Sequence, residues 1–230
     1  MMPAVKICGL VRPDDVACAA AAGARYVGAI LAGGPRLVTA ENARRAFEHA
    51  GAATRVVVVG HEPVDDIVRV AMAAGADIVQ LHGDPSPRMV DDLRERWPGG
   101  IWAALRVSAP SFDRERAAAL FAVADGVVLD AYVPGALGGT GVTIDWQALK
   151  TPLAIVRAAA DANALLVLAG GLQPENVATA IRVLAPDVVD VSSGVESAPG
   201  IKDHARVRRF IAAARGDRGD DEQLSLAGVQ

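Results

Sequence analysis

The amino-acid sequence predicts a single (β/α)8 barrel, the TIM-barrel fold, and two observations support this prediction. Eight short β-rich runs recur along the chain, and Ala-rich amphipathic segments separate them. The length of 230 residues is close to the ~250 residues typical of such a barrel. An open doubly wound sheet is the alternative, because eight strand–helix units also fit that class. Against it, the first predicted strand is not followed by a GxGxxG motif.

Most of the predicted strands are nearly continuous apolar runs, which is typical of strands buried on both faces of a parallel sheet. They cover residues 4–8, 25–31, 54–60, 77–82, 101–107, 125–130, 165–170 and 187–192. The segments between them include PDDVACAAAAGA, TAENARRAFEHAG, PVDDIVRVAMAAGA and PENVATAIRVLAP. Several of these segments open with Pro, Asp or Thr and close with Gly, residues that favour the beginning and the end of a helix.

No linker or change of composition marks a second domain, so we assign residues 1–215 to one barrel. The longer interval between the sixth and seventh strands is interpreted as a glycine-rich loop followed by a helix. The last residues, 216–230, are charged and aperiodic, and we expect them to form a disordered tail.

Composition excludes several classes of protein. The net charge of −4 and the aromatic content of 4% argue against a nucleic-acid partner, which needs clustered Lys and Arg or stacking side chains. The cysteines, Cys8 and Cys18, cannot form a disulfide framework for this length and lack CxxC spacing. The chain shows no signal-peptide core and no apolar run long enough for a bilayer. We expect a cytoplasmic monomer or homodimer that binds neither membrane nor metal.

Polar residues stand at the carboxyl ends of the predicted strands, where barrel enzymes build their active sites. Side-chain alternation puts Gln80 and His82 on one face of their strand, and Asp190 and Ser192 on one face of theirs. Cys8 has two open interpretations, because a free cysteine usually packs as an inert hydrophobe. The candidates at strand ends are Cys8, Gln80, His82, Arg106, Asp130, Asp190 and Ser192.

The loops after the seventh and eighth strands are candidates for a phosphate site. Gly170 and Gly171 allow the backbone to approach a ligand closely. Ser192, Ser193 and Gly194 precede a short segment that can begin an extra helix and offer N–H donors to an anion. These two loops hold phosphate in many barrels of this class. The alternative is a pair of tight turns in which Gly and Ser serve geometry alone.

A long segment between Asp130 and Trp146 contains Gly138, Gly139, Thr140 and Gly141. Loops of this length are usually functional or disordered. We expect a mobile flap over the site, with a plain surface loop as the alternative.

Arg36 lies in the sequence GGPRLV after the second strand, at the functional end of the barrel. We expect an unpaired guanidinium there that can bind a carboxylate through two parallel hydrogen bonds. A solvated surface arginine is the alternative.

Taken together, these motifs resemble the phosphoribosylanthranilate isomerases of tryptophan biosynthesis. Single pieces such as LAGGL are weak signals, but the set is specific, and it follows the predicted strands in order from about residue 5 to residue 214. The motifs are KICG, GPRLV, VQLHG, LDA…GGTG…DW, LAGGL.PENV and DVSSGVESAPGIKD.

The resemblance implies an Amadori rearrangement of N-(5-phosphoribosyl)anthranilate, with no metal or organic cofactor. It implies that Cys8 is the general base and Asp130 the general acid, and that Arg36 holds the anthranilate carboxylate. Further implied contacts are His82 and Asp190 to the substrate, and Gly171, Ser193 and Gly194 to its phosphate.

These residue types suit that chemistry. A buried, protonated carboxyl such as Asp130 can deliver a proton to the ribose ring oxygen. A thiolate at Cys8 can then remove the acidified C2 proton, since free cysteine titrates near ~8.5. We further expect Lys6, which shares a strand face with Cys8, to lower the pKa of this thiol.

Three other functions compete with this interpretation. A metal-dependent epimerase needs several His and Asp at strand ends, and of the four histidines only His82 ends a strand. Indoleglycerol phosphate synthase chemistry uses strand-end lysines, and only Lys6 lies in a strand. A non-catalytic or differently specific phosphosugar-binding barrel stays open, because it needs the phosphate loops but neither Cys8 nor Asp130.

Overall fold

The computed structural model describes residues 2–107, 112–131, 145–160 and 163–217. Each of the eight barrel strands matches a predicted strand to within two residues at either end. The strands are β1 (Ala4–Ile7), β2 (Tyr26–Ile30), β3 (Thr54–Val59), β4 (Ile78–Leu81), β5 (Gly100–Val107), β6 (Gly126–Ala131), β7 (Leu165–Leu168) and β8 (Val188–Val191).

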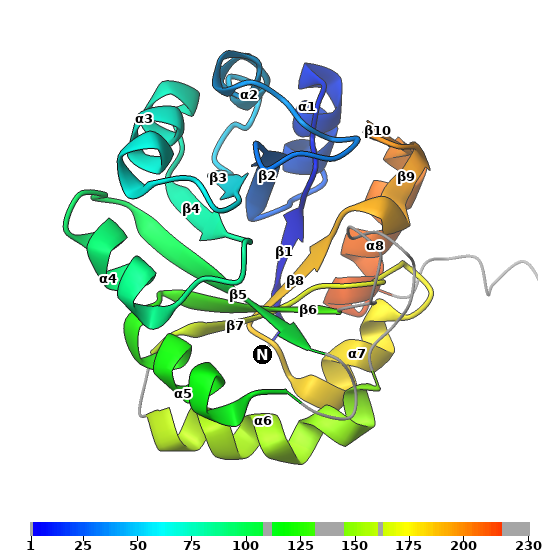
Figure 1. Ribbon diagram of the computed structural model, residues 1–230. Helices are drawn as coiled ribbons and strands as arrows, with labels where there is room; N and C mark the ends of the chain where they lie inside the picture. The colour runs from blue at the N-terminus through cyan, green and yellow to red at the C-terminus, as the bar shows by residue number, and fades with distance from the viewer. Residues whose placement is uncertain (1, 108–111, 132–144, 161–162, 218–230) are drawn as a thin grey trace, which may run out of the picture.

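These strands form a closed parallel barrel, so the predicted (β/α)8 fold is confirmed. Neighbours in the sheet follow the order of the sequence, and β1 pairs with both β2 and β8. Closure at that seam makes the alternative of an open sheet wrong. Figure 1 shows the strands at the centre of the molecule and the helices around them.

The helices begin and end where the sequence offers capping residues. Thr39, Ser86, Asp113 and Asp203 each accept a hydrogen bond from a backbone N–H in the first turn of the helix that follows. Gly75 ends a helix in the left-handed conformation, at φ 67°. The helices are α1 (Pro13–Ala21), α2 (Ala40–Phe47), α3 (Val64–Ala74), α4 (Pro87–Arg94), α5 (Arg114–Val123), α6 (Trp146–Ala160), α7 (Val177–Leu184) and α8 (His204–Arg215).

The two faces of the strands form two apolar cores. Outward-facing residues such as Val5 and Ile7 pack in the layer between strands and helices. A smaller cluster inside the barrel contains Trp102 and Val167. Because successive side chains in a strand alternate between faces, Lys6 on β1 points into the barrel interior, although it is charged. An ionisable side chain in that position needs a partner.

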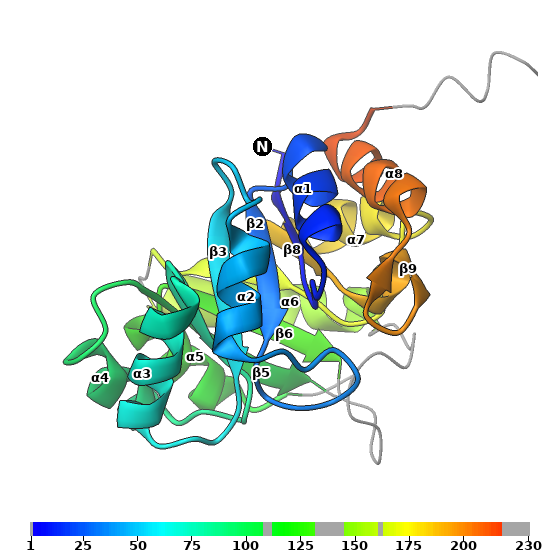
Figure 2. The same ribbon diagram turned by 90° about the horizontal axis from the view of Figure 1, so that it is seen from above.

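The segment after β8 departs from the regular pattern. In place of the expected extra helix there is a single 3₁₀ turn, η1 (Ser193–Val195), followed by an antiparallel hairpin of β9 (Glu196–Ala198) and β10 (Ile201–Lys202). Figure 2 shows β9 beside α8 and the amino terminus at the same end of the molecule as the last turn of α8. The Arg215 guanidinium donates to the Gly23 carbonyl at that end, at 2.8 Å.

Two predicted segments lie outside the described residues: the loop with Gly138, Gly139, Thr140 and Gly141, and the tail from residue 218 onward. Within the described ranges, the helices lack the combination of length and apolar character that a bilayer span requires.

Candidate active site

A cavity of about 700 Å³ opens at the carboxyl ends of the barrel strands. Gln80 and Ser192 line it together with His82 and Asp190, so the predicted alternation on β4 and β8 is confirmed. It brings together the described residues predicted for catalysis and binding, which are Cys8, Arg36, His82, Asp130, Gly170, Gly171, Asp190, Ser193 and Gly194.

Cys8 directly follows β1 and is held in place by backbone contacts. Its N–H donates to the Val191 carbonyl at the end of β8, at 2.8 Å. A Cβ at Gly28 on β2 would lie 3.1 Å from the Cys8 Sγ and 3.2 Å from the Lys6 Cε. Glycine at position 28 therefore leaves the space in which these two side chains lie.

The Cys8 thiol is buried, and burial raises its pKa above the ordinary value. The Lys6 ammonium offsets part of this rise through its charge and a hydrogen bond, whereas the charge of Asp190 adds to it. Lys6 therefore lowers the pKa of this thiol, as expected, but burial outweighs the nearby cation and the net shift is a rise.

Lys6 and Asp190 form a buried ion pair beside the thiol. Sheet register places them side by side on β1 and β8, and the Lys6 Nζ donates to the Asp190 Oδ2 at 2.7 Å. Burial alone lowers the pKa of Lys6, but the charges of Asp190 and Cys8 together bring it above its ordinary value. Lys6 is therefore a cation at neutral pH and a fixed positive charge next to Cys8.

Asp130 lies on β6 with its carboxyl partly exposed to the cavity. Burial raises its pKa above the ordinary value; Asp190 adds to the rise, and His82 and Arg106 oppose it. The His82 Nε2 lies 3.7 Å from the Asp130 Oδ2. A carboxyl whose pKa is raised keeps its proton at higher pH, as a general acid requires.

The loops after β7 and β8 come into contact at one side of the cavity. Gly170 and Gly171 adopt φ of 84° and 68°, in the left-handed region that favours glycine. A Cβ at Gly194 would lie 1.9 Å from the backbone oxygen of Leu172. Glycine at these positions thus allows two backbone segments to pack closely at the cavity wall.

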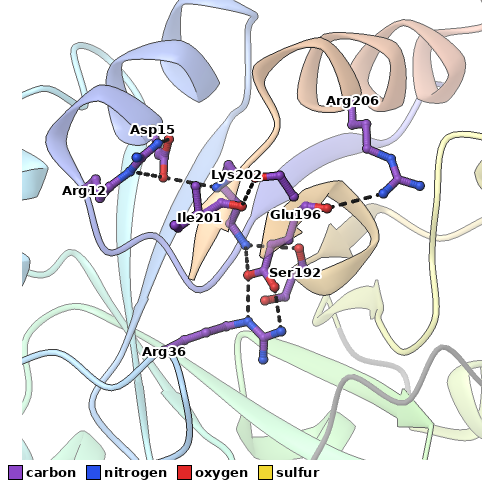
Figure 3. A network of polar contacts seen from close by, with 9 residues as sticks. Arg12, Asp15, Arg36, Ser192, Glu196, Ile201, Lys202 and Arg206 are labelled. Atoms are coloured by element: carbon purple, nitrogen blue, oxygen red, sulfur yellow. Dashed lines mark hydrogen bonds and ion pairs between the residues drawn. The ribbon is translucent and has the colours of Figure 1, made fainter. Parts of the chain in front are cut away.

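Arg36 is paired, contrary to the prediction of an unpaired guanidinium. Its Nε and Nη2 donate to the two carboxylate oxygens of Glu196, each at 2.7 Å (Figure 3). Lys202 donates to the same carboxylate at 2.8 Å. Neither Glu196 nor Lys202 was predicted as a site residue. The available signal was the scarcity of lysine, which occurs only at positions 6, 150 and 202.

Several buried polar atoms at the cavity have no hydrogen-bond partner among the described residues. Buried polar groups are normally paired, so such atoms indicate a place for a polar ligand. Gln80 belongs to this set and was noted at a strand end but not predicted to bind. The atoms are Gln80 Oε1, His82 Nδ1, Asp190 Oδ1 and Ser192 Oγ.

A second hollow, of about 860 Å³, lies at the opposite end of the barrel. Ala and Gly make up much of its lining, with Tyr26, His49 and Arg215 among the polar side chains. The described residues around it include neither a cysteine nor a carboxylate, whereas Cys8 and Asp130, predicted as base and acid, line the first cavity. In the same described ranges, no three His, Cys, Asp or Glu side chains cluster as metal ligands would.

Comparison with known proteins places the chain in a family. The sequence pattern of N-(5'phosphoribosyl)anthranilate (PRA) isomerase matches residues 5–213. An N-(5'-phosphoribosyl)anthranilate isomerase of Haloferax volcanii is 40% identical over 232 aligned residues, covering 98% of this chain and all of that protein. The isomerase of Rubrobacter xylanophilus is 41% identical over 220 residues, with 93% and 100% coverage.

Solved structures agree. The crystal structure of the Thermotoga maritima phosphoribosyl anthranilate isomerase superposes with a TM-score of 0.82 at 35% identity, covering 94% of this chain and 100% of that one. An isomerase in complex with reduced 1-(o-carboxyphenylamino)-1-deoxyribulose 5-phosphate gives a TM-score of 0.79 at 34% identity, with the same coverage. With a matching barrel and a match over nearly its whole length, the chain belongs to the N-(5'-phosphoribosyl)anthranilate isomerase family.

Proposed function

We propose that the protein isomerises N-(5'-phosphoribosyl)anthranilate to 1-(2-carboxyphenylamino)-1-deoxyribulose 5-phosphate, the third step from chorismate to tryptophan. The observation that supports this most directly is the pairing of Cys8 and Asp130 at one cavity, beside an ion pair and two glycine-rich loops. A phosphorylated small molecule with a carboxylate at its other end fits such a site.

Asp130 is the general acid in this proposal. It donates its proton to the ribose ring oxygen as the bond between that oxygen and C1 breaks, and the anthranilate nitrogen lone pair forms a C1=N iminium. The raised pKa of Asp130 supports the role, because the carboxyl must carry a proton in the reactive form.

Cys8 is the general base. Its thiolate removes the C2 proton, which the iminium has made acidic, and the electron pair neutralises the nitrogen to give an enolamine. Transfer of a proton from the C2 hydroxyl to C1 then produces the ketone. Return of the proton from the Cys8 thiol to the Asp130 carboxylate through solvent restores the enzyme, so protons balance without a cofactor.

The remaining predicted residues bind the substrate. Arg36 holds the anthranilate carboxylate, and the backbone N–H groups around Gly171 and Gly194 hold the phosphate, with Gly170 and Ser193 beside them. His82 and Asp190 contact the ribose hydroxyls, which is supported by their polar atoms without partners among the described residues.

Cys8→Ala and Asp130→Asn test this function. We expect each variant to lower kcat by about 10²–10⁴-fold, the usual contribution of general acid–base catalysis. Reduced 1-(o-carboxyphenylamino)-1-deoxyribulose 5-phosphate, measured by calorimetry, should bind both variants within about threefold of the wild-type Kd, because neither change removes a phosphate or carboxylate contact. A wild-type protein that binds this analogue without turning over substrate would instead be a non-catalytic binding barrel.

We also propose that residues 1–215 form the whole catalytic unit and that residues 216–230 are a tail outside it. The support is that α8 ends at Arg215 and that Gly216 stops it in the left-handed conformation, at φ 72°. A small-molecule biosynthetic enzyme of this kind is expected in the cytoplasm, as a monomer or homodimer.

A further inference from the structure

The contact between Arg36 and Glu196 joins segments 160 residues apart in the sequence. Arg36 lies in the loop after β2, and Glu196 is the first residue of β9. The contact uses the side of the guanidinium: Nε donates to one carboxylate oxygen and Nη2 to the other, both at 2.7 Å. The side chains are only 14% and 6% exposed. Paired, charge-assisted hydrogen bonds of this kind fix both distance and orientation.

Glu196 is itself fixed from the other side. The Lys202 Nζ donates to the same Oε1 that Arg36 uses, at 2.8 Å, and to the Ser192 carbonyl at 3.0 Å. The backbone N–H of Lys202 donates to the buried carboxylate of Asp15, at 3.2 Å. Figure 3 shows this chain of contacts running from α1 through the hairpin to Arg36. The hairpin thus connects Arg36 to the body of the barrel.

Charge within this cluster does not cancel. Arg36 is a cation and Glu196 is one carboxylate. Burial lowers the pKa of Lys202, and its hydrogen bond to Glu196 opposes that shift; when Lys202 is protonated, the three side chains together carry one positive charge. The Glu196 carboxylate stays ionised because hydrogen bonds from Arg36 and Lys202 bring its pKa below the ordinary value, although burial alone raises it. The excess charge is available to an anion in the cavity that Arg36 lines.

Geometry also leaves room for that anion. A guanidinium has five N–H donors in one plane. Glu196 occupies the Nε donor and one Nη2 donor. Among the described residues, Nη1 has no hydrogen-bond partner, so the end of the guanidinium formed by Nη1 and Nη2 can donate to a second carboxylate.

We propose that Glu196 is a positioning residue, which holds the guanidinium of Arg36 in the orientation that receives the anthranilate carboxylate. Lys202 supplies a second cation beside Glu196, so that Glu196 does not neutralise the charge of Arg36. This inference rests on the proposed function, because it assigns a fixed support to the group that binds one end of that substrate. The benefit is preorganisation: an arginine already ordered loses less conformational freedom when the ligand binds.

A competing role for Glu196 predicts the opposite change in ligand affinity. If Glu196 instead competed with the substrate carboxylate for Arg36, its neutralisation would tighten binding. If Glu196 positions Arg36, its neutralisation weakens binding of ligands that have the carboxylate and leaves other ligands unchanged.

The test is Glu196→Gln, assayed with reduced 1-(o-carboxyphenylamino)-1-deoxyribulose 5-phosphate and with the same compound lacking its carboxylate. We expect the Kd of the carboxylated analogue and the KM of the substrate to rise about tenfold, a typical loss for one charge-assisted contact. The Kd of the carboxylate-free analogue, the inhibition constant of inorganic phosphate and kcat should stay within about threefold. Lys202→Met, which changes the cluster without touching Arg36 directly, should lower the same selectivity for the carboxylate.

Asp77→Asn is the matched control. Asp77 binds Arg55 in the same side-on manner, at 2.6 and 2.9 Å, but at the other end of the barrel. The Asp77→Asn variant should leave the ratio of the Kd values for the carboxylated and carboxylate-free analogues unchanged. A wild-type ratio in Glu196→Gln, or tighter binding of the carboxylated analogue, would overturn the positioning role alone. Absence of turnover in the wild-type protein would overturn the proposed function first.

Discussion

Polar side chains at the two ends of the barrel differ in how completely they are hydrogen-bonded. At the amino-terminal end, an aspartate precedes each of β4, β6 and β8. Each carboxylate accepts a hydrogen bond from a backbone N–H of the neighbouring strand, at 2.7–2.8 Å, and binds an arginine. These residues are Asp77 with Arg55, Asp125 with Arg94 and Asp187 with Arg157. At the carboxyl end, Gln80, His82, Asp190 and Ser192 each keep a buried polar atom without a partner among the described residues.

This difference in hydrogen bonding indicates that the polar groups at one end serve stability and those at the other end are available to a ligand. A polar group whose hydrogen bonds are complete contributes to folding and offers little to a ligand. A buried polar group with spare capacity costs stability until a ligand binds it. Barrels of this class place catalysis at the carboxyl ends and stability at the amino-terminal ends, and here the pairing of individual atoms shows that division.

Two glycines, one at each end of the barrel, each pack against a backbone oxygen, and their substitution should have the largest and most different effects. A Cβ at Gly194 would lie 1.9 Å from the Leu172 oxygen, and one at Gly99 would lie 2.3 Å from the Asp77 oxygen. We expect both Gly→Ala variants to lose about 1–3 kcal/mol of stability, since backbone must move in each. Only Gly194→Ala should weaken phosphate binding, by about 30-fold or more, because it displaces the proposed phosphate loops.

The measurement is the inhibition constant of inorganic phosphate beside the urea unfolding transition of each variant. Equal phosphate affinity in Gly194→Ala and Gly99→Ala would contradict the placement of the phosphate site between the loops after β7 and β8.

The fold was predictable from the sequence because its signals are local and repeated. Continuous apolar runs such as TRVVVVG identify strands buried on both faces, and helix starts such as Thr39 and helix stops such as Gly75 appear at the expected spacing. The hairpin β9–β10 was not predicted, because its strands have only three and two residues and their pattern is too short to recognise.

The site was predictable only in part. The position of Cys8 and Asp130 at the cavity was predictable, because a polar residue at the end of an apolar strand is visible in the sequence. Glu196 was missed, since its contact with Arg36 spans 160 residues and depends on how the hairpin folds back. The net rise of the Cys8 pKa was also not predictable: Lys6 lowers this pKa as expected, but the balance between burial and the Lys6 charge depends on packing that no local pattern encodes.

The raised pKa values of Cys8 and Asp130 predict the pH dependence of kcat/KM. In the proposed mechanism, the reactive form has Cys8 as thiolate and Asp130 protonated. Between the two pKa values, this form is a small and constant fraction of the protein. The value of kcat/KM should therefore be constant between the two pKa values. It should fall about tenfold per pH unit below the Asp130 pKa, because thiolate is lost, and above the Cys8 pKa, because the Asp130 proton is lost.

Asp130→Asn separates these two groups. Its residual kcat/KM should rise about tenfold per pH unit through the neutral range up to the Cys8 pKa, since only the thiolate is then required. A residual rate independent of pH in this range would argue against a titrating thiol as the base. At the other end of the barrel, Asp187→Asn should keep the wild-type profile.

Asp187→Asn is also the smallest change that we expect to detect, and it acts on stability alone. The Asp187 carboxylate accepts from the Leu166 N–H at 2.7 Å and from Arg157 at 2.8 Å, and about a third of each charged side chain is exposed. An asparagine carbonyl can still accept from the backbone, and a partly exposed ion pair contributes little, so the free energy of unfolding in urea should fall by only about 1 kcal/mol. Asp66→Asn, which breaks an exposed pair within α3, should change it by less than about 0.5 kcal/mol. A loss of kcat/KM in Asp187→Asn at full folding would show that the amino-terminal end takes part in function, and the division between the two ends would fail.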